Sequence, residues 1–330
     1  ATTEIYTLSL HDAFPIYNTE VTIMAFTAQD VKTLRERTGC GMMDCKKALT
    51  QADGDMEKAI DVLREQGLAK AAKKASRIAA EGVAFAYTND DSTAGVALEV
   101  NAETDFVAKN ADFQGFVKTV AETVMAEKPA TVEELLTKTA VGTEMTVADL
   151  LQEKIQTIGE NIIIRRFERY EGVVATYIHA GGKIGVLVEA ATDNNSDAVK
   201  EALKNVAMQI AALNPKYVST SDVPDDYKAH EKEILMAQAK NDEKNANKPE
   251  NIIEKMIEGR LNKELKEVCL LEQEYVKAEN KETVAKYLEA VSKEVGSTVT
   301  LKRFVRFETG EGLEKKNEDF AAEVAAQMNA

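Results

Sequence analysis

The first part of the chain carries apolar residues at helical spacing in three short runs. Val31 and Leu34, for example, lie about one turn apart on the same predicted face. Capping residues and glycines bound the runs, because Thr and Asp favour helix starts and Gly favours helix ends. The predicted helices cover Thr27–Gly39, Met42–Ala52 and Asp55–Gly67. We therefore expect a three-helix N-terminal domain over residues 24–67, preceded by a leader or extension over residues 1–23.

Residues 68–81 form an alanine-rich basic segment, LAKAAKKASRIAAE. Alanine has the highest helix propensity, but the segment has little apolar surface to bury. It is therefore predicted to be a solvated helical linker. A basic patch that binds RNA is the alternative, since its lysines and its arginine would attract phosphate groups.

From residue 82 onward, apolar and polar positions alternate, and the pattern occurs twice. GVAFAY at Gly82 returns as GVVATY at Gly172, and GVALEV at Gly95 returns as GVLVEA at Gly185. Both pairs are 90 positions apart, and such alternation is typical of strands with one buried face. The apolar face of a following helix keeps the same offset: Phe113, Phe116, Val117 and Val120 correspond to Leu203, Val206, Ala207 and Ile210.

A second correspondence, with an offset of 137 positions, completes each copy. RRFERYE at Arg165 corresponds to KRFVRFE at Lys302, and TVADLL at Thr146 corresponds to TVAKYL at Thr283. Each copy therefore reads strand, turn, strand, helix, further helix, strand. The predicted fold class is α+β, with two duplicated subdomains that each contain a three-stranded antiparallel sheet. The first subdomain covers residues 82–171, and the second covers residues 172–223 and 269–309.

The second copy is longer than the first by about 47 residues. Two helical runs, Asp225–Asp242 and Pro249–Glu267, occupy this insertion on either side of a polar stretch. We expect an antiparallel helical hairpin, of the coiled-coil type, over residues 224–268. Its apolar stripe, which includes Ile253 and Leu261, also offers a surface for self-association.

The last segment, residues 310–330, has no counterpart in the repeat. Phe320, Val324 and Met328 recur at i, i+4, i+8, which predicts a helix with one apolar stripe. Such a helix docks on its own protein or on a partner. Because the duplicated body is complete without it, we favour a partner.

Composition narrows the class of partner. Hydrophobic residues make up 44% of the chain and charged residues 29%, which fits a folded protein. The net charge of −15 argues against nucleic acid as a direct partner, because phosphate neutralisation needs surplus Lys and Arg. No run approaches the ~20 apolar residues of a membrane span, so no membrane is expected either. The composition is compatible with a protein partner.

Cysteines and histidines give no sign of a metal site or other cofactor. Cys40, Cys45 and Cys269 are too few for a disulfide framework and indicate a reducing compartment, the cytoplasm. Cys40 and Cys45 make half of a metal-binding pattern, but no second pair follows. Glu103 and Asp105 form a carboxylate pair without a nucleophile or a glycine-rich phosphate loop, so we expect no enzymatic activity.

The stretch NAETDFVAKN places a large apolar side chain, Phe106, just after a predicted strand. Taken alone, a Phe at such a position is more often part of a core. The alternative is that its side chain enters another protein.

Several long segments, in order, resemble the family of bacterial translation elongation factor Ts. They are LRERTGCGMMDCKKAL at Leu34, TDFVAKN at Thr104, IGVLVEA at Ile184, IIEKMIEGRL at Ile252 and RFETGEGLEK with DFAAEVAAQ from Arg306 to Gln327. The resemblance covers the chain from about Met24 onward. The sequence departs from the family pattern in residues 1–23 and at Cys40, where the family usually has Ala.

The resemblance implies a guanine nucleotide exchange factor for elongation factor Tu, the GTPase of translation elongation, without cofactor or covalent chemistry. It places Thr104, Asp105, Phe106 and Val107 where they disturb the Mg²⁺ site of the partner. Further partner contacts are implied at Met42, Met43, His179, Phe320 and Val324.

Two of these positions also have a structural interpretation, since Met42 shares a helix stripe with Cys45 and Leu49, and His179 precedes a glycine turn. The three-helix domain resembles ubiquitin-associated folds, so a peptide-binding adaptor is the alternative function.

Overall fold

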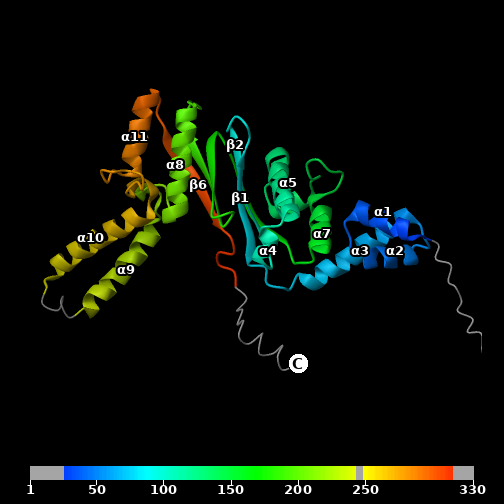
Figure 1. Ribbon diagram of the computed structural model, residues 1–330. Coiled ribbons are helices and arrows are strands. Elements are labelled where there is room, and N and C mark those ends of the chain that lie inside the picture. Colours follow the sequence, from blue (N-terminus) through cyan, green and yellow to red (C-terminus); the bar gives the residue numbers. More distant parts are fainter. Residues whose placement is uncertain (1–25, 243–247, 315–330) are drawn as a thin grey trace, which may run out of the picture. The chain divides into compact units, whose positions relative to one another are not determined.

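The computed structural model describes residues 26–242 and 248–314 (Figure 1). The chain divides into two compact units, an N-terminal unit that ends at Gln66 and a C-terminal unit that begins at Gly67. Within the described residues, no helix is both long and apolar enough to cross a membrane.

The N-terminal unit contains α1 (Ala28–Thr38), α2 (Met42–Gln51) and the first part of α3 (Met56–Lys74). Thr27 and Asp30 cap α1 reciprocally, because the Thr27 amide donates to Asp30 Oδ2 at 2.7 Å and the Asp30 amide donates to Thr27 Oγ1. The core of the unit consists mainly of Val31, Leu34, Cys45, Ala48, Leu49, Ala59 and Leu63.

Helix α3 does not end at Gly67, as the sequence suggested, but continues to Lys74. Gly67 is buried, and a Cβ there would lie 2.5 Å from Gln156 Oε1, so the glycine allows a close approach to α7 (Val147–Ile158). The segment is also not simply solvated, since the side-chain amide of Asn161 donates to the carbonyl of Arg77 at 2.9 Å.

The C-terminal unit contains two three-stranded antiparallel sheets, which confirms that part of the predicted fold. The first sheet has the order β1 (Glu81–Thr88), β2 (Ala94–Ala102), β3 (Ile163–Glu171). The second has the order β4 (Val173–His179), β5 (Ile184–Ala191), β6 (Thr300–Glu308). The register of the central strand shifts between Glu99 and Val100 in one sheet and between Glu189 and Ala190 in the other, so even the irregularity repeats after 90 positions.

The two sheets pack face to face, and helices cover their outer faces (Figure 1). Helices α5 (Ala111–Glu127), α6 (Val132–Thr137) and α7 bury the outer face of the first sheet, and α8 (Asp197–Leu213) and α11 (Val284–Val295) bury that of the second. The side chains between the sheets include Ala84, Ala97, Tyr170, Val174, Leu187 and Phe307.

Glycine at the start of each central strand permits this packing. A Cβ on Gly95 would lie 2.5 Å from Leu187 Cδ1, and a Cβ on Gly185 would lie 2.9 Å from the carbonyl oxygen of Ala84. The two glycines occupy equivalent positions of the repeat, and each brings its strand against the opposite sheet.

A buried carboxylate lies on the central strand of each sheet. Glu99 pairs with Arg165 and Arg166, and Glu189 pairs with Lys302 and Arg303. The guanidinium groups then cross between the sheets. Arg166 lies 4.4 Å from the ring centroid of Phe307, and Arg303 lies 3.9 Å from that of Tyr170.

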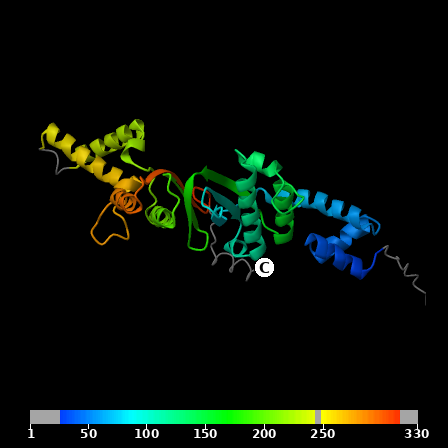
Figure 2. The same ribbon diagram turned by 90° about the horizontal axis from the view of Figure 1, so that it is seen from above.

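The insertion in the second copy forms α9 (Asp225–Asn241) and α10 (Glu250–Val268), which lie side by side in both views (Figure 2). Leu235, Ala239 and Ile257 pack between them. Short 3-10 turns at Thr220–Asp222 and Leu270–Glu272 flank the hairpin.

Candidate partner-binding site

Phe106 lies on α4 (Asp105–Ala108), a single helical turn between β2 and α5. Its side chain is 81% exposed, whereas the next residue, Val107, is buried in the core of the first sheet. The core interpretation of Phe106 is therefore wrong. The turn uses one apolar residue as an anchor and presents the other to solvent.

The start of α4 is fixed by a carboxylate from a distant part of the sequence. Glu160 accepts hydrogen bonds from the amide of Thr104 at 3.0 Å, from its hydroxyl at 2.7 Å and from the amide of Glu103 at 3.1 Å. The Glu103 carboxylate in turn accepts from the amide of Asn161 at 2.6 Å. This network fixes the backbone at the start of the turn that carries Phe106.

Asp105 lies beside Phe106 and is paired with a cation. Its carboxylate accepts a hydrogen bond from Lys109 at 2.7 Å, at the i, i+4 spacing that favours such pairs. That hydrogen bond holds the pKa of the Asp105 carboxyl below its ordinary value, and the charge of Lys183 acts in the same direction. The carboxylate next to the exposed ring therefore stays charged at neutral pH.

His179 ends β4 and is exposed, with its Nδ1 3.1 Å from the Tyr177 hydroxyl. The turn that follows packs on β1, where the Ala84 amide donates to the Gly182 carbonyl at 2.7 Å. Since α4 also contacts β1, this strand supports both the Phe106 turn and the turn after His179. The influence of Lys183 on Asp105 agrees with that proximity.

Met42 and Met43 begin α2 in the N-terminal unit and are 53% and 64% exposed. The interpretation of Met42 as part of the core stripe is therefore wrong. As the first residue of the helix it lies beyond the packed turns, whose buried residues are Cys45, Ala48 and Leu49. The pair forms an exposed, adaptable apolar surface.

Two of the predicted contact residues, Phe320 and Val324, lie outside the described residues, as does the predicted C-terminal helix. Sequence reasoning missed Glu160 and Lys183. Lys183 borders a glycine turn and could have been noticed there, whereas nothing local marks Glu160 as the anchor of α4.

Across the described part of the chain, no group of three His, Cys, Asp or Glu side chains could hold a metal ion. Cys40, Cys45 and Cys269 are all buried. Burial raises the pKa of the Cys45 thiol, and raises that of Cys269 to about 11. These two thiols are therefore unreactive at neutral pH.

The chain is a mixed α+β protein with an internal repeat. It consists of a duplicated three-stranded unit with one hairpin insertion, and of a separate helical unit. Residues 103–311 match the family model described as Elongation factor TS. The protein named Elongation factor Ts from Clostridium perfringens is 54% identical over 302 residues, which cover 91% of this chain and 98% of that protein. The chain belongs to the elongation factor Ts family, a family of translation elongation factors.

Proteins with the same name from other bacteria are similarly close. That of Clostridioides difficile is 53% identical over 305 residues, covering 92% of this chain and 98% of its own length. That of Trichlorobacter lovleyi is 52% identical over 311 residues, again covering 92% and 98%.

Proposed function

We propose that the protein is a guanine nucleotide exchange factor for elongation factor Tu and acts in the cytoplasm, where translation takes place. Family membership supports the partner, and the exposure of Phe106 on a fixed helical turn supports the mechanism. The factor makes and breaks no covalent bond and needs no cofactor, because its work is to bind one state of the GTPase better than another.

The affinity of the GTPase for GDP determines how much free energy the binding site must contribute to nucleotide release. A GTPase that holds GDP with nanomolar affinity has about 12 kcal/mol of binding free energy to overcome. Accelerating GDP release ten-thousandfold requires lowering the barrier by about 5.5 kcal/mol. Because the coupling between two ligands is reciprocal, the factor weakens GDP binding by the same ratio as GDP weakens binding of the factor.

Phe106 supplies part of this free energy as a wedge. Burial of its ring in the partner is worth about 1.5–3 kcal/mol. The fixed start of α4 directs that free energy into displacing elements of the partner, since a loosely held ring would move aside instead. The displaced elements hold Mg²⁺, whose charge is among the largest that bind the nucleotide phosphates.

The wedge alone does not reach 5.5 kcal/mol, so other contacts must contribute. Thr104 positions α4, Val107 anchors it and Asp105 adds a fixed negative charge beside the ring. We assign the remaining contacts to His179 and to the exposed pair Met42 and Met43. The C-terminal residues Phe320 and Val324 are assigned to the partner on the family resemblance.

Replacement of Phe106 by Ala tests this function. We expect GDP release from elongation factor Tu, followed by stopped-flow fluorescence at saturating factor, to slow by one to two orders of magnitude, about 1.4 kcal/mol per tenfold change. Val141→Ala is the matched control, because Val141 is also an exposed apolar residue of the C-terminal unit. Wild-type exchange by a folded Phe106→Ala variant would reject the wedge.

The exposure of Met42 and Met43 also favours a second function, that of an adaptor which binds peptides through the N-terminal unit. An adaptor would bind its partner without changing the rate of GDP release. The same stopped-flow assay with the unmodified protein separates the two functions.

A further inference from the structure

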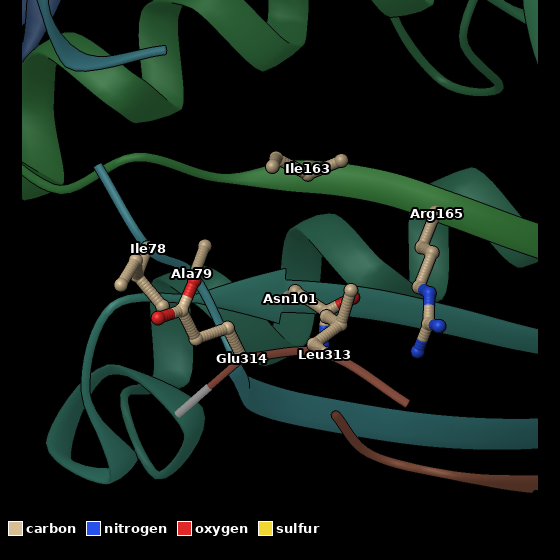
Figure 3. A pocket seen from close by; sticks show the side chains of 7 residues that line it. All are labelled: Ile78, Ala79, Asn101, Ile163, Arg165, Leu313 and Glu314. Atoms are coloured by element: carbon tan, nitrogen blue, oxygen red, sulfur yellow. The ribbon is translucent and has the colours of Figure 1, made fainter. Parts of the chain in front are cut away.

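A cavity of about 260 Å³ opens in the C-terminal unit beside the place where the described chain ends (Figure 3). Ile78, Ile163 and Leu313 give it apolar walls, and Asn101, Arg165 and Glu314 add polar groups. Ile78 and Ile163 are each 41% exposed. An engineered apolar cavity of about 150 Å³ already accepts a benzene ring, so this one has room for an aromatic side chain.

One wall of the cavity carries a polar atom without a partner. Asn101 is 1% exposed, and its amide nitrogen donates to the carbonyl of Glu81 and to the Glu99 carboxylate. Its Oδ1 is buried and accepts no hydrogen bond within the described structure. A buried acceptor of this kind is costly, so Asn101 would gain from a donor brought to this region.

Two hydrogen bonds hold the chain at Gly310 and Glu311, just before it reaches the cavity. The amide of Gly310 donates to the buried Glu99 carboxylate at 2.8 Å, and Arg165 donates to the carbonyl of Glu311 at 2.7 Å. Gly310 has a φ of 73°, and a side chain there would collide with the carbonyl oxygen of Ala80. The course of the chain at Gly310 and Glu311, just after the last strand, is therefore fixed.

We propose that the cavity is the docking site of the chain's own C-terminal segment and that Phe320 is the side chain that enters it. Leu313 and Glu314 already line the cavity, and residues 315–330 continue from its wall. Phe320 follows Glu314 by six positions, which span at most about 20 Å, so the ring is within reach.

Charge is compatible with this occupant, and proximity favours it over a second copy. Glu318 and Asp319, directly before Phe320, complement Arg165 at the edge of the cavity. A segment tethered this closely has an effective concentration on the order of millimolar, which a separate chain reaches only at high protein concentration. This docking concerns the free protein and does not depend on the proposed exchange activity.

The absence of tryptophan from the chain allows a direct test. In a Phe320→Trp variant of the full chain, the introduced indole is the only one. We expect its emission to be blue-shifted relative to the same protein in urea and its quenching by acrylamide to be several-fold weaker. Both properties should be independent of protein concentration.

A second substitution, in the wall of the cavity, then identifies the site. Ile163→Glu in the Phe320→Trp background should shift the emission to the red and restore quenching. Thr300→Glu, at the equivalent exposed strand position of the second copy, is the matched control and should leave both unchanged. A synthetic peptide of residues 315–330, added to millimolar concentration, should displace the indole without any change to the fold.

Three results would overturn the proposal. Emission and quenching like those in urea would mean that the segment is free, or waits for a partner protein. A blue shift that grows with protein concentration would mean that a second copy is the occupant. A blue shift that survives both Ile163→Glu and the peptide would place Phe320 at a different surface.

Discussion

Glu99 and Glu189 occupy equivalent positions in the two copies of the repeat, yet their surroundings differ. The cations beside Glu99, Arg165 and Arg166, have side chains that are 24% and 33% exposed. Those beside Glu189, Lys302 and Arg303, are 56% and 46% exposed.

Glu99 also accepts hydrogen bonds from Asn101 and from the Gly310 amide. In the first copy the shared structural carboxylate therefore also anchors the chain at Gly310, whereas in the second copy the equally buried carboxylate pairs with two more exposed cations. The duplicated carboxylates therefore keep the same strand position but have different hydrogen-bond partners in the two copies.

The largest effect should come from removing the carboxylate of the first copy. Glu99→Ala leaves Arg165 and Arg166 partly buried without the carboxylate that they share, and Arg166 keeps only its longer contact with Glu311. Breaking a buried pair in this way costs about 3–5 kcal/mol. Glu189→Ala should cost about 1.5–3 kcal/mol, because water reaches Lys302 and Arg303 and replaces the lost hydrogen bonds. Urea denaturation of both variants measures the difference.

The conservative variants Glu99→Gln and Glu189→Gln serve as controls, since they remove the charge and keep the shape. An equal loss of stability in the two alanine variants would mean that the difference in exposure has no energetic consequence.

The close approach of the sheets offers a second comparison. In Gly185→Ala the new methyl group meets the backbone of Ala84, which cannot move without disturbing β1. In Gly95→Ala it meets the end of the Leu187 side chain, which can rotate. Overpacking costs about 1–3 kcal/mol, and we expect Gly185→Ala to lie at the upper end of that range and Gly95→Ala at the lower.

Thermal unfolding followed by circular dichroism measures both variants under the same conditions. The reverse order of stabilities would show that the side chains between the sheets, rather than the backbone, limit how closely the sheets pack.

The hairpin marks the largest difference in length between the copies. Its outer part has a small core of its own, and the first copy has no such insertion. We expect deletion of residues 231–260, closed by a short turn, to leave one cooperative melting transition. Changing loop length costs only about 0.6 kcal/mol per twofold change.

The deletion keeps Tyr227, Leu261 and Leu265, which pack at the base of the hairpin. Loss of cooperative melting would mean that the outer hairpin belongs to the core of the second copy. Sedimentation of the same variant also tests the predicted self-association, which should disappear with the outer hairpin.

The smallest effect concerns the last residue of the third strand in each copy. Glu171 pairs with Lys128 and Arg169, and these cations lower the pKa of its carboxyl to about 2. Its counterpart Glu308 pairs with Arg306. The position equivalent to Lys128, the left-handed cap of the preceding long helix, is Asn214. The caps and buried faces of α5 and α8 correspond at an offset of 86, so the offset of 90 that the sequence suggested for this helix is wrong, although it holds for the strands.

Because the folded pKa of Glu171 is depressed, its stabilising contribution is present at neutral pH and is lost as the pH falls toward about 2. An NMR titration of the carboxyl carbon should give a midpoint near 2, which Lys128→Ala should move toward the ordinary value. No change in that variant would assign the shift to Arg169 alone.

The repeat made the sheets predictable, and local capping made several helices predictable. Thr146 and Gly159 bound α7, and Thr283 and Gly296 bound α11 at the same offset of 137 positions. The single-turn helix α4 was not predicted, because four residues are too few to show helical periodicity.

Other errors came from contacts between distant residues. Gly67 resembles a helix end until Gln156 is placed against it. The exposure of Phe106 depends on Val107 taking the core position and on Glu160 fixing the turn. None of these relations appears in the spacing of neighbouring residues.

The crossed contacts between the sheets resemble those at the interface of a two-fold symmetric homodimer. Each copy supplies one guanidinium and one ring, Arg166 facing Phe307 and Arg303 facing Tyr170. In such an isologous interface every contact occurs twice. A substitution in one of these residues therefore removes one of the two cation–ring contacts and leaves the equivalent contact intact. The interaction that joins the two sheets is present twice within one chain.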